Sequence, residues 1–122
     1  MYIRGGTFTN NNIRLLYSSK GYSIIEDMTI ENNTQTSAIV YYGERTAKLN
    51  FSNSSVKNNT ADASVAIRAY GQTTIVSISN VIFESNTATV DRGTITIMDE
   101  AKVVVQDCSF TYNSSPIASV FL

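Results

Sequence analysis

The sequence has no histidine, no tryptophan, one cysteine and one proline among its 122 residues. The absence of histidine removes the commonest general base in enzymes and the usual ligand of zinc. The lone cysteine, Cys108, can form neither an internal disulfide nor a thiolate metal cluster, and we expect it to be a small buried side chain. Few routes to catalysis or to a tightly bound metal remain, so we expect no cofactor.

Charge is scarce and balanced, with nine basic and ten acidic residues. Because positive charge is not in excess, we expect no nucleic-acid partner. No apolar run approaches the roughly 18 residues of a membrane-spanning helix, so we expect no membrane insertion. The first residues, MYIRGGTF, lack the pattern of a signal peptide. A signal that has been removed or a longer parent chain would both explain this.

Uncharged polar residues are abundant instead, since asparagine, serine and threonine supply 41 residues, about a third of the chain. With 43% apolar residues, this composition favours β-structure with enough apolar side chains for a core. A chain of this length corresponds to one domain, residues 1–122.

An apolar residue followed three positions later by asparagine recurs along the whole chain. The steps between successive apolar members are 22, 26, 27 and 27 residues. Five copies in register are the signature of a repeat architecture. The five pairs are Phe8–Asn11, Ile30–Asn33, Val56–Asn59, Phe83–Asn86 and Phe110–Asn113.

Each pair is preceded by a strand pattern. Apolar residues mostly stand seven and five positions before the apolar anchor, as Leu49 and Phe51 do, which is typical of a strand buried on one face. The alternation then changes phase, which requires a bend three positions before the anchor. Residues that tolerate a left-handed backbone stand at this bend, namely Gly5, Asp27, Asn53, Asn80 and Asp107.

A second strand follows each asparagine and ends at a turn. We expect its inward residues to be Leu15, Ile39, Ile67, Ile95 and Val120. Each repeat therefore contains two or three short strands, and one repeat cannot bury its own apolar face. The pattern predicts an all-β, right-handed parallel β-helix of about five coils of 22–28 residues.

The recurring asparagines are predicted to form a ladder at one corner of the coil. Backbone groups at a corner have no strand partner, and an inward amide can bond both the corner backbone and its copy one coil away. We expect a structural rather than a catalytic role for these positions and for the polar residues of the bend. The expected ladder positions are Asn11, Asn33, Asn59, Asn86 and Asn113, with Asp27, Asn53, Asn80 and Asp107 at the bend.

Two tyrosines, Tyr42 and Tyr70, align beside the turn after the second strand. We expect both to point outward, where they would either shield the corner or contact a ligand such as a glycan.

Five N-x-S/T sequons are present, and the repeat register divides them. Two fall on ladder positions, Asn53 and Asn113, and are expected to be inaccessible. Three are expected to face outward, and would be glycosylation sites in a secreted eukaryotic protein: Asn32, Asn50 and Asn58.

The segments FESNTATVDRGTITI and VKNNTADASVAIRA resemble the FxxN and GGA(I/L/V) repeats of chlamydial polymorphic membrane proteins and related β-helix surface proteins. The resemblance covers essentially all 122 residues. Three copies keep the phenylalanine, Ile30 and Val56 replace it in the others, and the GGAI positions have the sequences SAI, VAI and GTI. The resemblance implies a secreted or surface-displayed β-helix used for adhesion or as a coat.

Many β-helices degrade polysaccharides with clustered carboxylates, often together with Ca²⁺. The aligned acids Asp27 and Asp107 would be three coils apart, roughly 14 Å, which is too far for a carboxylate pair. The acidic group Asp91, Asp99 and Glu100 fits a solvated turn, with weak Ca²⁺ binding as the alternative. We therefore expect that the protein is not an enzyme.

No capping element is recognisable, and the repeats wind through about four and three-quarter coils. Two explanations fit: a segment of a longer β-helix, or a protomer that stacks head to tail on a second copy of itself. The expected function is that of a non-enzymatic structural β-helix, extracellular or at the cell surface. An adhesin that binds carbohydrate or a receptor is the alternative, and a polysaccharide-degrading enzyme comes third.

Overall fold

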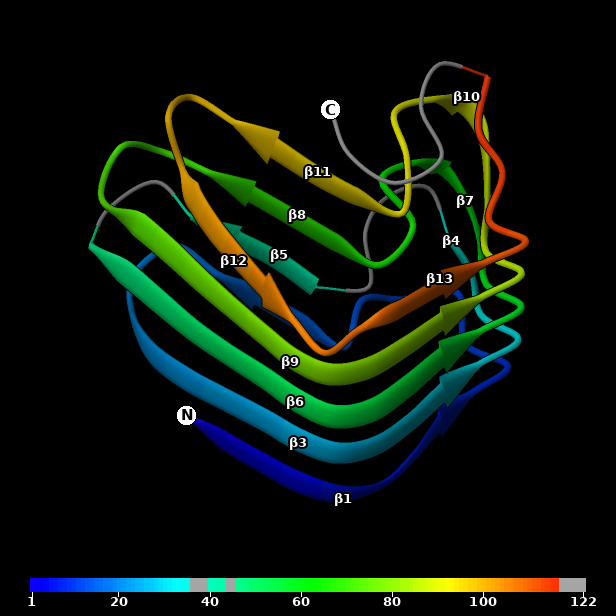
Figure 1. Ribbon diagram of the computed structural model, residues 1–122, viewed down its shortest axis with the longest axis horizontal. Coiled ribbons are helices and arrows are strands. Elements are labelled where there is room, and N and C mark those ends of the chain that lie inside the picture. Colours follow the sequence, from blue (N-terminus) through cyan, green and yellow to red (C-terminus); the bar gives the residue numbers. More distant parts are fainter. Residues whose placement is uncertain (36–39, 44–45, 117–122) are drawn as a thin grey trace.

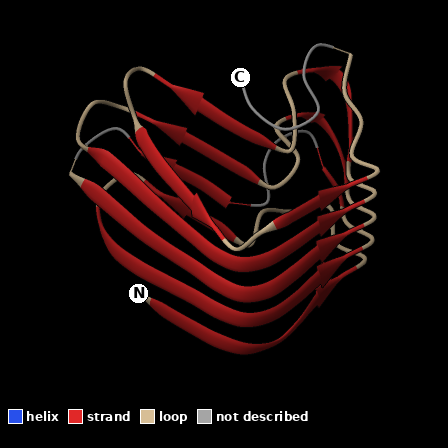
Figure 2. Ribbon diagram, in the orientation of Figure 1, coloured by secondary structure: helices blue, strands red, loops and turns tan. Residues whose placement is uncertain are grey.

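The protein is all-β, with thirteen strands and no helix in the computed structural model, which describes residues 1–35, 40–43 and 46–116 (Figures 1 and 2). Every strand pairs in parallel with a strand of a neighbouring coil. In each complete coil the chain follows the first sheet, turns through the third and returns along the second, with a right-handed winding (Figure 1). The predicted right-handed parallel β-helix is confirmed.

The three sheets differ in length and regularity. The first sheet contains β1 (Tyr2–Thr9), β3 (Gly21–Glu31), β6 (Ala47–Lys57), β9 (Thr74–Glu84), β12 (Lys102–Gln106) and β13 (Ser109–Thr111). The second contains β2 (Leu16–Ser18), β5 (Val40–Gly43), β8 (Ile67–Tyr70) and β11 (Ile95–Met98). The third contains β4 (Thr34–Gln35), β7 (Thr60–Ala63) and β10 (Thr87–Asp91).

The number of complete coils is smaller than expected. The first sheet has five layers, because β12 and β13 both pair with β9, but the third sheet has three strands. Among the described residues, about three coils therefore have all three sides, instead of about five. Within the described residues, the first repeat contributes β1 and the last contributes β12 and β13 to the first sheet, and neither contributes a strand of the third sheet.

Register in the first sheet follows the repeat alignment. The anchors pair in one column, as Phe8 does with Ile30 and Val56 with Phe83. The residues five positions earlier pair in the same way, with Phe51 opposite Ile78. Because a slip by one residue would turn every apolar side chain outward, the apolar pattern determines this register.

The bend in each long strand has the predicted left-handed backbone. Gly5, Asp27, Asn53, Asn80 and Asp107 have φ values of 63°, 56°, 49°, 53° and 52°. All five are exposed, however, so the polar members do not form a second inward ladder. The expectation that Asn53 is inaccessible is wrong for the same reason: its side chain projects outside the bend.

A substitution at Asn80 tests why these residue types stand at the bend. We expect Asn80→Gly to change the free energy of unfolding little, because glycine adopts φ near 53° without strain. Asn80→Val is expected to cost about 1–2 kcal/mol, since a β-branched residue is strained in the left-handed region. Urea unfolding followed by circular dichroism measures both. Equal stabilities of the two variants would contradict this account of the bend.

The second sheet shows a correction to the predicted register. Its inward column consists of Leu16, Val40, Ile67 and Ile95, all at most 5% exposed. The prediction was correct for Ile67 and Ile95, but Leu16 and Val40 take the places predicted for Leu15 and Ile39. In the first two repeats, adjacent positions are both apolar, so the alternation could not choose between them. Ile39 and Val120 lie outside the described residues.

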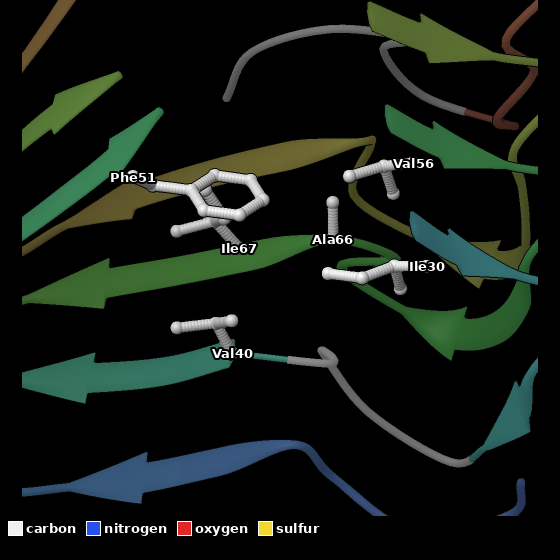
Figure 3. A pocket seen from close by; sticks show the side chains of 6 residues that line it. All are labelled: Ile30, Val40, Phe51, Val56, Ala66 and Ile67. Atoms are coloured by element: carbon white, nitrogen blue, oxygen red, sulfur yellow. The ribbon is translucent and has the colours of Figure 1, made fainter. Parts of the chain in front are cut away.

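The interior is a continuous apolar column. Figure 3 shows the side chains of Ile30, Val40, Phe51, Val56, Ala66 and Ile67 meeting from the first and second sheets. The gap between them does not admit a water molecule. Phe83 lies between Phe51 and Phe110, with ring centroids 6.4 Å and 4.8 Å away. The core is therefore dry and packed, and carries no ligand cavity at this point.

Candidate functional site

The asparagine ladder is the most ordered polar feature of the interior. Asn33, Asn59 and Asn86 have no solvent exposure, whereas Asn11 and Asn113, at the two ends of the ladder, are partly exposed. Each residue just before a ladder asparagine has a left-handed backbone, with φ between 53° and 56°, and this turns the chain at the corner. The corner removes strand partners from the backbone, and the amides replace them.

The amide of Asn59 shows how an interior member of the ladder is satisfied. Its oxygen accepts from the backbone N–H and the side-chain amide of Asn33, at 3.0 Å and 2.9 Å. Its NH₂ group donates to the carbonyl of Ile30 at 3.2 Å and to the amide oxygen of Asn86 at 3.0 Å. The backbone carbonyl of Asn59 accepts from the backbone N–H of Thr87. All the hydrogen-bonding groups of this buried side chain are therefore in use.

The ladder has a direction. From Asn11 to Asn86, each member donates its backbone N–H and one amide hydrogen to the amide oxygen of the next coil. One end therefore presents an acceptor, the Asn11 amide oxygen, to which no donor within the described residues comes. The other end presents donors, the Asn113 backbone N–H and its second amide hydrogen, and these are likewise unmatched among the described residues. The two ends are complementary to each other.

The predicted alignment of Tyr42 with Tyr70 on the outer surface is wrong. Gly43, rather than Tyr42, pairs with Tyr70, so the two tyrosines do not align. The Tyr70 side chain is partly buried, and a Cβ on Gly43 would collide with its ring and carbonyl. This packing is that of a shield over the corner. The side chain of Tyr42 lies outside the described residues.

The three sequons expected to face outward are exposed: Asn32, Asn50 and Asn58. Asn32 and Asn58 have left-handed backbones at the ladder corner, with φ of 56° and 53°. The Asn50 amide is not free, because it donates to the Tyr22 hydroxyl oxygen at 2.8 Å. Asn113 is partly exposed, but its amide belongs to the ladder.

Charged groups gather on the outer face of the first sheet near β1. Arg4 donates to the Asp27 carboxylate at 3.0 Å and lies 3.5 Å from Glu26, whose carboxylate also accepts from the Tyr2 hydroxyl. The hydrogen bond with Glu26 raises the pKa of Tyr2, and the one with Asp27 raises the pKa of Arg4. The contribution of Tyr2 to stability is thus present below its ordinary pKa and is lost as pH rises through the raised value.

The remaining acidic and thiol groups do not converge. Asp99 and Glu100 are exposed, with φ of 51° and 63°, in the turn after β11, and Asp91 lies 3.6 Å from Arg92. Across the part of the chain that the structure describes, no three acidic or cysteine residues are grouped as metal ligands. Cys108 is partly rather than fully buried, since it packs against the end of the core column.

A shallow groove on the outer face of the first sheet was not anticipated from the sequence. It has a volume of about 560 Å³ and is lined by Tyr22, Lys48, Asn50, Ile75 and Ser77. Tyr22 and Ile75 are 52% and 37% exposed. Tyr22, Lys48 and Ile75 occupy one outward row of the repeat, but three different residue types in a row give no repeating signal in the sequence.

Comparisons with protein-family models, curated proteins and solved structures find no match to this chain. The assignment of the fold as a parallel β-solenoid therefore rests on the strand geometry and on the repeat pattern of the sequence. None of the described segments is a helix long and apolar enough to cross a membrane.

Proposed function

We propose that this protein is a non-enzymatic structural β-helix, extracellular or at the cell surface, and that separate copies of it stack end to end. The observation that carries the proposal is the direction of the asparagine ladder. One end offers the Asn11 amide oxygen, and the other offers the Asn113 backbone N–H and amide hydrogen. A second copy placed head to tail would continue the same hydrogen bonds, whereas head-to-head stacking would oppose acceptor to acceptor.

The strand edges and the core column support the same arrangement. Ile3 and Phe8 at one end, and Val105 and Phe110 at the other, are partly buried residues that pack against the core. A further coil would cover their exposed surface and pair the outer edges of β1 and β12. A heterologous contact of this kind repeats without closing, and so produces a filament.

The surface location rests on the likeness of the repeats to those of chlamydial polymorphic membrane proteins, and a relation to that family is part of the proposal. Uncharged polar side chains on the outer faces of the coils are compatible with it. Protease treatment of intact cells of the source organism tests the location. Cleavage without lysis is expected for a surface protein, and full protection until lysis would contradict it.

End-to-end stacking is tested with the purified chain. We expect negative-stain microscopy to show fibres one β-helix wide, and sedimentation velocity to show a concentration-dependent series of oligomers. Asn11→Ala should weaken association by about tenfold or more, because two donors of the adjoining copy would lose their acceptor. Within the variant chain, the amide oxygen of Asn33 still accepts a hydrogen bond from the backbone N–H of residue 11.

Asn12→Ala provides the matched control, since Asn12 is exposed beside the ladder. This variant should associate like the original chain. A monodisperse short rod for the original chain would rule out stacking. Equal weakening by both substitutions would show that the ladder does not determine the contact.

A further inference from the structure

We propose that the groove on the outer face of the first sheet binds an acidic saccharide. This site lies on the flank of the β-helix, away from the two end surfaces on which stacking depends. Ligand binding in the groove and end-to-end stacking of copies can therefore be tested independently, and either can fail without the other.

Three neighbouring coils build the groove. Tyr22 on β3, Lys48 on β6 and Ile75 on β9 are register partners in one row, and Asn50 pairs with Ser77 in the row beside it. Tyr22 and Ile75 therefore stand two strand spacings apart, roughly 9.6 Å, with Lys48 and Asn50 between them. The groove over these side chains has a volume of about 560 Å³, which accommodates a short run of pyranose rings.

The tyrosine is held in place before any ligand arrives. The Asn50 amide donates to the Tyr22 hydroxyl oxygen at 2.8 Å across the strand pair. This diagonal bond restricts the ring while 52% of the residue stays exposed. A rigid aromatic ring that leaves apolar surface open to solvent is suited to the apolar face of a sugar ring, since little side-chain entropy is lost on contact.

The polar partners of a sugar are placed around this ring. Ser77 supplies a hydroxyl, the Asn50 amide oxygen is an acceptor, and Lys48 supplies an ammonium group. Hydroxyl groups of a saccharide can bond to all three, and this mixture distinguishes the groove from a purely apolar patch.

The charge of the groove selects among saccharides. Lys48 and Lys102 flank Ile75 in the same outward row and bring two ammonium groups to this side of the sheet. A sugar that carries a carboxylate or sulfate therefore gains an interaction that a neutral sugar lacks.

Titration of the ¹⁵N-labelled chain with a chondroitin sulfate tetrasaccharide tests the site. We expect saturable shifts of the backbone amides of Lys48, Asn50, Ile75 and Ser77, and weaker binding at higher salt. Tyr22→Ala should weaken the affinity by about tenfold, and Lys48→Ala by about two- to fivefold. The carboxyl-reduced, desulfated tetrasaccharide should bind at least about tenfold more weakly.

Tyr2→Ala is the matched control, because Tyr2 is 57% exposed on the neighbouring strand of the same face but does not line the groove. This variant should bind like the original chain. Absence of saturable shifts would overturn the proposal, and so would equal affinity for the neutral tetrasaccharide. Unchanged binding by Tyr22→Ala would place the ligand elsewhere and would also overturn it.

Discussion

Replacement of Asn59 by alanine is expected to lower the free energy of unfolding by about 3 kcal/mol or more. The substitution removes the amide oxygen that accepts from Asn33 and the NH₂ group that donates to Ile30 and Asn86. The backbone N–H of Asn33 and the carbonyl of Ile30 would remain buried without these partners. Each such orphan costs about 1–3 kcal/mol, since both groups belong to buried residues.

The neighbouring residue gives the control for this experiment. Asn58 is exposed and has φ of 53°, a conformation that glycine adopts freely. Asn58→Gly should therefore leave the stability within about 1 kcal/mol of the original. Urea unfolding monitored by circular dichroism compares the two variants. A loss in Asn59→Ala no larger than that in Asn58→Gly would show that the ladder does not stabilise the corner.

The ladder also explains why the sequence could predict so much of the first sheet. A buried corner needs an amide in every coil, and the coil needs an apolar anchor three residues before it, so the pair recurs at nearly constant spacing. The structure pairs the anchors as the repeats align them, for example Phe83 with Phe110. In this part of the molecule, local chemistry and long-range register impose the same pattern.

The second sheet could not be predicted to the residue. The loop between the ladder asparagine and the returning strand varies in length: Asn33 and Val40 are separated by seven positions, and Asn86 and Ile95 by nine. Adjacent apolar residues such as Leu15 and Leu16 give no alternation to fix the face. A shift by one residue here was enough to align Tyr42 with Tyr70, whereas the structure pairs Gly43 with Tyr70.

The groove was missed for a different reason. The repeat alignment places Tyr22 and Asn50 outward, but their hydrogen bond runs diagonally between two coils and depends on side-chain rotamers. Residues that do not repeat carry no periodic signal, so only the structure brings them together. In a head-to-tail filament the groove would recur every five layers, roughly 24 Å, and weak single contacts could combine into stronger binding to a polymer.

Replacement of Phe83 by alanine is expected to cost about 3–5 kcal/mol, among the largest effects of any single substitution. The ring has no solvent exposure and lies 4.8 Å from the ring of Phe110, at an interplanar angle of 10°. Its removal would open a cavity in the packed apolar column, and the coils on either side cannot collapse without breaking their register. Because each coil is stabilised by its two neighbours, loss in a central coil weakens both contacts.

Phe110→Ala is the matched comparison, since Phe110 occupies the same column one coil further on but is only partly buried. Its loss should cost clearly less, about 1–2 kcal/mol, because solvent already reaches part of the ring. Denaturant unfolding of dilute samples keeps association from adding to the measured stability. If both substitutions cost the same, the column would not be the continuous core that the register implies. If Phe110→Ala approaches the cost of Phe83→Ala only at high protein concentration, a second copy covers that end of the column, as head-to-tail stacking requires.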